Sequence, residues 1–497
     1  MKKLYLYNTL SRKKEEFKPI KTSSRPSPSK GEGEKRVVSF YHCGPTVYWT
    51  QHIGNLRGMV CADLIRRVFE YNGYKFKHVR NYTDVGHLTG DNLGDADSGE
   101  DRMEKAAKRE KLDPQKIAEK YIKEFEKDTK ELNILEPTKK PRATKYIKEM
   151  IGMIEVLIKK DFAYTTDLAV YFDITKAKDY TRLSGQKLED CISGAGKGDV
   201  SDSQKKCPSD FALWFFKAGK HKNALQFWPS PFKSSLVKNG EGFPGWHIEC
   251  SAMSKKLLGD TIDIHMGGIE HAPVHHTNEI AQSESANGVE FTKYWLHNEH
   301  LLVNNKKMAK SEGTGFSLSE VKDKGFSPSA LRYFFLQAHY RSKQNFTWEA
   351  MEAAESGLRH LKNQIRELGF YDSKGVYIKI SGEKYINDNF KNKFLEVIND
   401  DFNIPQALAI VQDLLKSDLT KNEKLSTIKD FNKVLGLGLD KPKQKRGLPV
   451  EIKNLIKSRK KARQEKNFKE SDKLRDKIEK FGYIIEDTKD GMRIFKK

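Results

Sequence analysis

The 497 residues exceed a single domain of about 100–200, and their 10% aromatic content argues against wholesale disorder. The formal net charge is +22, and residues 441–497 alone hold 20 Lys or Arg against 9 Asp or Glu. No segment has the roughly 18 uncharged apolar residues of a membrane-spanning helix, the N-terminus is too charged for a signal peptide, and five cysteines form no disulfide framework. We therefore expect a multidomain protein of the cytoplasm, without a membrane partner.

The first predicted elements form a βαβ unit, the start of a parallel sheet. Residues 21–36 are rich in Ser, Pro, Gly and Lys and are expected to form an exposed loop, whereas the run VVSFYHC at 37–43 predicts a buried strand. A turn-rich loop follows it. KFKHVRNYTD at 75–84 predicts a second strand. Between the two strands, apolar residues at every fourth position predict a helix that ends near Gly73: Leu56, Val60, Leu64 and Val68.

The alternation of strands and helices is then interrupted. A polar loop entering a helix is predicted over 89–111, the pattern from about 115 to 160 is helical, and 161–240 are predicted to be an irregular, Gly-rich insertion. Alternation resumes with a strand near 260–268 and a helix over 275–288. This order indicates one sheet that is split by an inserted domain.

The C-terminal part is predicted to be mostly helical. Residues 294–305 are one further strand candidate, helical patterns dominate from about 330, and 441–449 form a linker. The basic excess beyond it fits a polyanionic partner and equally a solvated, lysine-rich surface. Its helical pattern places three apolar residues on one packed face: Leu474, Ile478 and Phe481.

The loop His52-Ile53-Gly54-Asn55 follows a predicted strand and opens a predicted helix, the position at which α/β folds bind phosphates. Backbone N–H groups and the positive helix end face an anion there, and a His can donate to a phosphate oxygen. Taken alone, the four residues are weak evidence, because an ordinary loop with a surface His gives the same pattern.

A second candidate is the run Lys307-Met-Ala-Lys310-Ser, which is followed by Glu-Gly-Thr-Gly. Two lysines three residues apart on such a loop can bracket a triphosphate and stabilise the charge that develops when pyrophosphate leaves. In a chain with this many lysines, a solvated pair is the simpler interpretation of this run alone.

A third candidate is a group of metal-binding side chains. His275 and Glu279 lie four apart on a predicted helix and therefore share one face. Cys43 ends the first strand, and Cys250 follows Gly-Trp-His-Ile-Glu. Without a compact Cys-x-x-Cys, spacing alone does not establish a metal site, and buried structural cysteines are the default. His276 is a rival ligand that should point about 100° away from His275.

In combination and in this order, these segments resemble cysteinyl-tRNA synthetase, a class I aminoacyl-tRNA synthetase. The resemblance rests on Cys43-Gly-Pro-Thr-Val-Tyr with His-Ile-Gly-Asn, Gly-Trp-His-Ile-Glu-Cys-Ser-Ala-Met at 245–253, His275-His-Thr-Asn-Glu and the Lys307 run. It extends over nearly the whole chain. Each segment is loosely specific by itself, but the ordered set is highly specific.

The resemblance implies an α/β fold with a Rossmann-like catalytic domain on a parallel sheet, split by an inserted connective domain and followed by a mostly helical tRNA-binding region. The expected domains are the catalytic first half at 1–130, the insertion at 131–240, the catalytic second half at 241–325, a helical stem-contact junction at 326–372, a helical bundle at 373–440 and the basic anticodon-binding segment at 441–497.

The implied activity is ATP-dependent ligation of L-cysteine to tRNA(Cys) through a cysteinyl-adenylate, by a monomer with one Zn²⁺ and with Mg²⁺ accompanying ATP. The zinc is expected to bind the substrate as a thiolate and so to reject serine without an editing domain. The metal ligands implied are Cys43, Cys250, His275 and Glu279. The catalytic residues implied are His52, Asn55, Lys307 and Lys310, with Thr46 and Gly54 also at ATP and with Gly44, Thr46, Thr83, Trp246 and His265 at the amino acid.

This sequence departs from the family at several positions. Asn55 ends the His-Ile-Gly signature, Ala309 stands between the two lysines, Thr277 replaces a frequent Glu, and Phe495 replaces a frequent Trp. The changed loop 269–274 bears on the substrate pocket rather than on the ligands. Two alternatives are a cysteine ligase acting on an amino sugar, which would lack the C-terminal extension, and a non-catalytic tRNA- or zinc-binding paralogue, which would not need His52 and the lysines.

Overall fold

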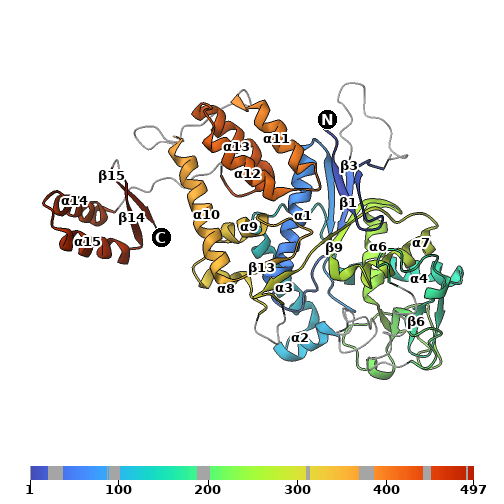
Figure 1. The fold of residues 1–497 in the computed structure, drawn as a ribbon. Coiled ribbons are helices and arrows are strands. Elements are labelled where there is room, and N and C mark those ends of the chain that lie inside the picture. The colour runs from blue at the N-terminus through green and yellow to red at the C-terminus, as the bar shows by residue number, and fades with distance from the viewer. Residues whose placement is uncertain are drawn as a thin grey trace, which may run out of the picture. The chain divides into compact units, whose positions relative to one another are not determined.

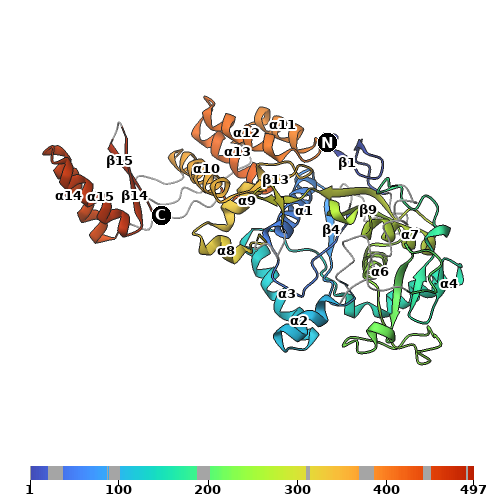
Figure 2. The same ribbon diagram turned by 60° about the horizontal axis from the view of Figure 1, so that its bottom comes forward.

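The structure is a computed structural model that describes residues 2–20, 37–86, 88, 101–186, 202–308, 314–368, 385–439, 449–488 and 491–496. The chain forms two compact units, one of residues 1–368 with 380–440 and one of residues 369–379 with 441–497. Figures 1 and 2 show the elements of each unit. Among the described helices, none is long and apolar enough to cross a membrane. The finer domain boundaries expected from the sequence stay predictions.

A four-stranded, fully parallel sheet organises the first unit and confirms the expected α/β class. Its strands are β3 (Val37–His42), β4 (Lys75–Arg80), β9 (Ile262–Gly268) and β10 (Thr292–Asn298), in the order β10-β9-β3-β4. The chain leaves β3 toward one edge and β9 toward the other, so the strand order reverses between these two central strands. In open α/β sheets the crevice at such a reversal is the usual ligand site.

Helices cover both faces of this sheet. Helix α1 (Ile53–Tyr71) lies on one face, and α6 (Trp246–Leu258) and α7 (His275–Asn287) lie on the other (Figure 1). The predicted first helix is confirmed, and it ends as expected because Gly73 adopts a φ of 85°, which favours glycine. The four apolar residues that predicted it are all buried: Leu56, Val60, Leu64 and Val68.

The helical stretch predicted over 115–160 is interrupted. After α2 (Arg102–Glu110), α3 (Pro114–Glu131) and α4 (Ile147–Lys159) are separated by a segment that contains Pro137 and Pro141, which lack the N–H that a helix needs. Instead, this segment makes parallel bridges beside β4, at Lys139 and Arg142.

The insertion is more regular than the sequence suggested. An antiparallel sheet in the order β5-β6-β7-β8 runs through it, with three short strands within 161–240 and β8 just beyond, which the sequence analysis did not predict. Its strands are short, and β7 (FALWFF) is buried at every position, so it lacks the alternation that marks a half-exposed strand. The other strands are β5 (Ala163–Thr165), β6 (Ala169–Phe172) and β8 (Gly242–Pro244), with β7 at Phe211–Phe216.

The single strand predicted over 294–305 is two strands in different sheets. β10 ends at Asn298, and β11 (Leu301–Val303) pairs with β12 (Lys306–Lys307) and β13 (Gln344–Phe346). The remaining elements of this unit are β1 (Tyr5–Asn8), β2 (Lys13–Glu16), α8 (Leu318–Asp323), α9 (Pro328–Leu336), α10 (Trp348–Glu367), α11 (Asp388–Ile398), α12 (Ile404–Lys416) and α13 (Lys421–Leu435), with 3₁₀ turns at Ala143–Lys145, Ile174–Lys176, Gly219–His221 and Ile269–His271.

The second unit contains α14 (Val450–Gln464), α15 (Phe468–Lys480) and a hairpin of β14 (Tyr483–Thr488) and β15 (Gly491–Lys496). Leu474 and Ile478 are buried, as the helical pattern predicted, but Phe481 is 59% exposed, so its predicted place on the packed face is wrong. It lies just beyond the last turn of α15, where the helical periodicity that placed it no longer applies. Three predicted segments lie outside the described residues: the loop 21–36, residues 89–100 of the polar loop and residues 441–448 of the linker.

Candidate active site

Most of the predicted site residues gather where the strand order reverses. Cys43 directly follows β3, and its N–H donates to the Met266 carbonyl of β9 at 3.0 Å. Cys250 lies on α6, whereas His275 and Glu279 lie on the first turns of α7. Segments more than 200 residues apart in sequence therefore meet at the carboxyl edge of the sheet.

The four predicted metal ligands form one buried cluster. Their ligand atoms all lie within 4.8 Å of one another. Cys43 Sγ is 3.9 Å from Cys250 Sγ and 3.8 Å from Glu279 Oε1, and His275 Nε2 is 3.1 Å from the same carboxylate oxygen. All four residues are buried. The structure thus contains a Cys/His/Glu group that could bind a metal ion.

A second set of possible ligands shares two of these residues. His265 Nε2 and His276 Nε2 each lie 3.4 Å from Cys43 Sγ, and with Glu279 they also form a group within 4.8 Å. The expectation that His276 points away from the cluster is therefore wrong. An imidazole extends far enough from the helix that a rotation of about 100° between neighbouring positions does not carry it out of reach.

Outer partners fix the histidine rings. His275 Nδ1 lies 2.9 Å from His247 Nδ1, and the His275 ring stacks on Trp246 with centroids 4.0 Å apart. On the other side, His276 Nδ1 lies 2.7 Å from His297 Nε2. These contacts turn the Nε2 atoms of both rings toward Cys43. Sequence analysis missed His247 and His297 as contributors, although His247 lies inside the Gly-Trp-His-Ile-Glu-Cys run.

The donor set fits a metal of the zinc type. Two sulfurs, an imidazole nitrogen and a carboxylate oxygen are ligands that Zn²⁺ accepts, and Glu279 Oε2 is buried without a hydrogen-bond partner. Burial raises the pKa of the Cys43 and Cys250 thiols and of Glu279, and it lowers the pKa of His275 to about 3. A bound cation would favour the deprotonated ligands and supply the missing partner.

The predicted amino-acid residues line the same edge. Gly44 N–H donates to Asn81 Oδ1 at 2.8 Å, and a side chain at Gly44 would collide with the Asn81 carbonyl. Thr46 and Thr83 form a parallel bridge, and Thr83 Oγ1 donates to Glu249 Oε2 at 3.0 Å. His265 is fully buried beside Cys43 and Trp246 is buried against His275, so all five predicted residues border one region.

The His52 loop has the geometry of an anion site. His52 is the N-cap of α1, and its Nδ1 accepts the Asn55 N–H at 3.3 Å. Because Nδ1 is the acceptor, the neutral ring carries its proton on Nε2, which can then donate to a phosphate oxygen. A Cβ at Gly54 would lie 3.0 Å from His52 Nδ1, so a larger residue would crowd the His52 ring.

The lysine loop meets this turn. A Cβ at Gly54 would lie 3.3 Å from Met308 Sδ, and Ile53 N–H donates to the Phe316 carbonyl at 2.7 Å. Residues on both sides of the second lysine therefore contact the start of α1. Lys307 is exposed at the end of β12. Lys310 and Ala309 lie outside the described residues.

Comparison with solved structures identifies the fold first. The Mycobacterium tuberculosis methionyl-tRNA synthetase in complex with methionyl-adenylate superposes with a TM-score of 0.54 over 83% of this chain and 92% of that one. At 12% sequence identity this likeness concerns the fold alone, which is that of an aminoacyl-tRNA synthetase.

Sequence comparison then identifies the family. Residues 30–356 match the family described as tRNA synthetases class I (C) catalytic domain, and residues 445–494 match the cysteinyl-tRNA ligase anticodon binding domain. The cysteine–tRNA ligase 1 of Burkholderia lata is 40% identical over 99% of this chain and 97% of its own length, and that of Treponema denticola is 41% identical over 97% and 98%. The chain belongs to the class I cysteine–tRNA ligase family.

Proposed function

We propose that the chain joins L-cysteine to tRNA(Cys) in two ATP-dependent steps. A cysteine carboxylate oxygen attacks the α-phosphorus of ATP, so that an O–P bond forms to give cysteinyl-adenylate while the bond to pyrophosphate breaks. A hydroxyl of the 3′-terminal ribose then attacks the adenylate carbonyl, losing its proton as the ester forms and AMP departs. The observation that carries this proposal is the buried thiol-containing cluster, which lies at the same sheet edge as the His52 loop.

Positioning and charge stabilisation supply the catalysis of the first step, because a carboxylate is already ionised at pH 7 and needs no general base. We assign His52 Nε2 and the start of α1 at Gly54 and Asn55, with Thr46, to the ATP phosphates. Lys307 and Lys310 bind the triphosphate and the departing pyrophosphate, with Mg²⁺ accompanying ATP. The contact of Met308 with the Gly54 turn supports a shared nucleotide site.

Selection of cysteine is assigned to a zinc ion held by Cys43, Cys250, His275 and Glu279. We prefer this set to the one with His265 and His276 because it contains both thiols, and Zn²⁺ binds thiolate strongly. Zinc would bind the substrate sulfur as a thiolate, an interaction that the hydroxyl of serine cannot match. Packing differences alone discriminate by only about 10–200-fold, so the cluster explains selectivity without an editing domain.

The remaining pocket residues orient the amino acid. Gly44 leaves room beside Asn81, Thr83 and Trp246 border the cluster, and His265 Nε2 lies 3.4 Å from Cys43 Sγ. For the second step, the basic α14–α15 unit is assigned to the tRNA anticodon, as the matching family description suggests. Removal of 441–497 should leave adenylate formation intact and raise the KM for tRNA, and unchanged charging would contradict this assignment.

We also propose that the protein works in the cytoplasm as a monomer. Cys43, Cys61, Cys207 and Cys250 are buried free thiols, which suits a reducing compartment. Light scattering of the purified protein, with and without tRNA, tests the monomer.

One assay series tests the function. The purified chain should retain about one zinc, catalyse cysteine-dependent ATP–pyrophosphate exchange, and esterify tRNA(Cys) but not a glucosamine-type amino sugar. Serine should support neither step. Exchange without tRNA charging, but with transfer to the amino sugar, would favour the alternative ligase. Absence of exchange by the zinc-loaded protein would contradict both.

A further inference from the structure

An aromatic residue at the rim of the nucleotide site has no role in the activity described above. Trp49 lies three residues before His52, and 37% of its surface is exposed. The Arg109 guanidinium on α2 lies 3.8 Å from the centre of the Trp49 ring. Aromatic side chains are the surfaces on which proteins stack single-stranded bases, and Arg adds cation–π attraction at such sites.

The neighbouring contacts hold this ring in place. Arg109 Nη2 donates to the Tyr48 carbonyl at 3.1 Å, and Arg102 Nη1 donates to the Tyr48 hydroxyl at 3.0 Å. Arg109 also pairs with Glu110 at 2.6 Å, so its position is fixed from two sides. Both aromatic residues of the loop are thus braced by cationic side chains of one short helix.

The same loop is tied to the nucleotide site. Gln51 Nε2 donates to the Trp49 carbonyl at 3.0 Å, and Gln51 Oε1 accepts the Asn55 Nδ2–H at 2.9 Å. A base that stacks on Trp49 is therefore held at a fixed position relative to the turn that opens α1. The tRNA 3′ end must reach this edge, because its ribose hydroxyl attacks the adenylate carbonyl.

We propose that Trp49, backed by Arg109, stacks an unpaired base of the tRNA 3′ terminus and so positions the terminal ribose for transfer. This inference rests on the proposed function and extends it. The side chain is partly exposed and carries a cation over its π-face, which suits a base on a flexible strand better than a small ligand that is enclosed in a pocket. Trp49 is a positioning residue that acts in the second step.

The test uses Trp49→Ala and Trp49→Phe in the full chain. Phe227→Ala is the matched control, since Phe227 is 38% exposed with Lys217 Nζ 3.4 Å from its ring centre. Single-turnover transfer from preformed adenylate to tRNA should fall about 10- to 100-fold in Trp49→Ala and recover largely in Trp49→Phe. Exchange without tRNA should stay within about threefold, and the Phe227 variant should match the wild type in both assays.

Abasic tRNAs separate stacking from a merely structural effect. The base is removed at each of the three 3′-terminal nucleotides in turn. At one position, this removal should slow wild-type transfer as much as Trp49→Ala does. Combining that abasic tRNA with Trp49→Ala should then cause no further loss. Losses that add at every position would overturn the proposal, as would a parallel fall in exchange, which would instead place Trp49 at the ATP adenine. A wild-type chain inactive in exchange would mean failure of the proposed function itself, whereas normal charging by both Trp49 variants would refute this inference alone.

Discussion

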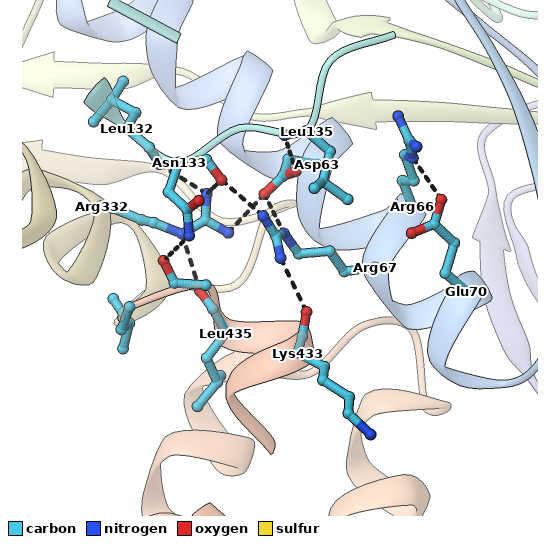
Figure 3. A network of polar contacts seen from close by, with 12 residues as sticks. Asp63, Arg66, Arg67, Glu70, Leu132, Asn133, Leu135, Arg332, Lys433 and Leu435 are labelled. Carbon is cyan, nitrogen blue, oxygen red and sulfur yellow. Dashed lines mark hydrogen bonds and ion pairs between the residues drawn. The ribbon is translucent and has the colours of Figure 1, made fainter. Parts of the chain in front are cut away.

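Two buried polar clusters of the first unit differ in whether their atoms are satisfied. Around Cys43, Glu279 Oε2 is buried with no hydrogen-bond partner, and His275 Nε2 has the other oxygen of the same carboxylate at 3.1 Å. Around Asp63 on α1, both carboxylate oxygens are used: Oδ2 accepts from Arg67 Nε at 2.7 Å and from Arg332 Nη2 at 2.6 Å, and Oδ1 accepts the Leu135 N–H at 2.8 Å (Figure 3).

The two arginines of the Asp63 cluster bind helix ends. Arg332 donates to the Leu435 carbonyl at 2.9 Å and the Leu132 carbonyl at 3.1 Å, and Arg67 donates to the Lys433 carbonyl at 3.0 Å (Figure 3). These carbonyls lie at or near the C-terminal ends of α3 and α13, where the helix dipole favours a cation. Because Arg332 itself lies on α9, the network joins α3, α9 and α13 to α1.

This difference distinguishes a cluster that stabilises the fold from a cluster that can bind an ion. A satisfied buried ion pair holds elements together, and removing one partner leaves an uncompensated charge. Nitrogen, oxygen and sulfur atoms that converge on one point and include an unpartnered carboxylate oxygen instead indicate a bound ion. Two clusters of similar burial thus predict different consequences of mutation, one in ligand binding and the other in stability.

The largest effect is expected for Cys250→Ser. Loss of a soft ligand should release the metal and reduce cysteine-dependent exchange by more than about 100-fold, beyond the 10–100-fold typical of an outer-shell partner. Metal content by mass spectrometry and pyrophosphate exchange measure the two effects. Cys207→Ser, at a buried thiol outside the cluster, is the control and should keep both properties. Full exchange by a metal-free Cys250 variant would refute the assignment.

Asp63→Asn should act on stability rather than on metal binding. With Arg332 and Arg67 left buried without their carboxylate, the free energy of unfolding should fall by about 3–5 kcal/mol. Denaturant titration gives the value, and the folded variant should still bind one zinc. Glu70→Gln is the matched control, because its pair with Arg66 at 2.7 Å is partly exposed and worth less than about 1 kcal/mol. Equal losses of unfolding free energy in the two variants would contradict the structural role assigned to the Asp63 cluster.

His247→Ala should weaken the metal site without emptying it. Its contact with His275 Nδ1 orients a ligand, so metal affinity should fall by about 10–100-fold. Competition with a chromophoric chelator measures this directly, independently of activity. An affinity equal to that of the wild type would mean that the packing of Trp246 alone orients the ring.

The smallest effect concerns pH. Burial alone would raise the pKa of Asp63, but Arg332 and Arg67 outweigh it and hold the pKa below its ordinary value. The ionised carboxyl therefore adds stability that is fully present above the ordinary pKa and is lost as pH falls through the lowered one. The stability difference between wild type and Asp63→Asn should be complete above about pH 4 and shrink as the pH falls below it. A constant difference across that range would exclude this linkage.

The sequence predicted what local patterns encode. Periodicity located α1, the composition of 37–43 located β3, and the ordered motifs identified the family and the four residues that the structure clusters. It could not place His276, because helix geometry gives a direction but not the position of Cys43 on a distant strand. The roles of Asp63 and Arg332 were also invisible, since the two residues lie 269 positions apart in sequence and the other partners of Arg332 are backbone carbonyls that any residue could supply.

The hydrogen bonds to α13 have a consequence for how the protein is made. The catalytic family match ends at residue 356, yet Asn133 Nδ2 donates to the Gly436 carbonyl, and both arginines use carbonyls from the same turn. A nascent chain that has just completed its catalytic segment still lacks these acceptors. Roughly 80 more residues must leave the ribosome, which takes about 4–16 s at about 5–20 residues per second, before α1 is anchored.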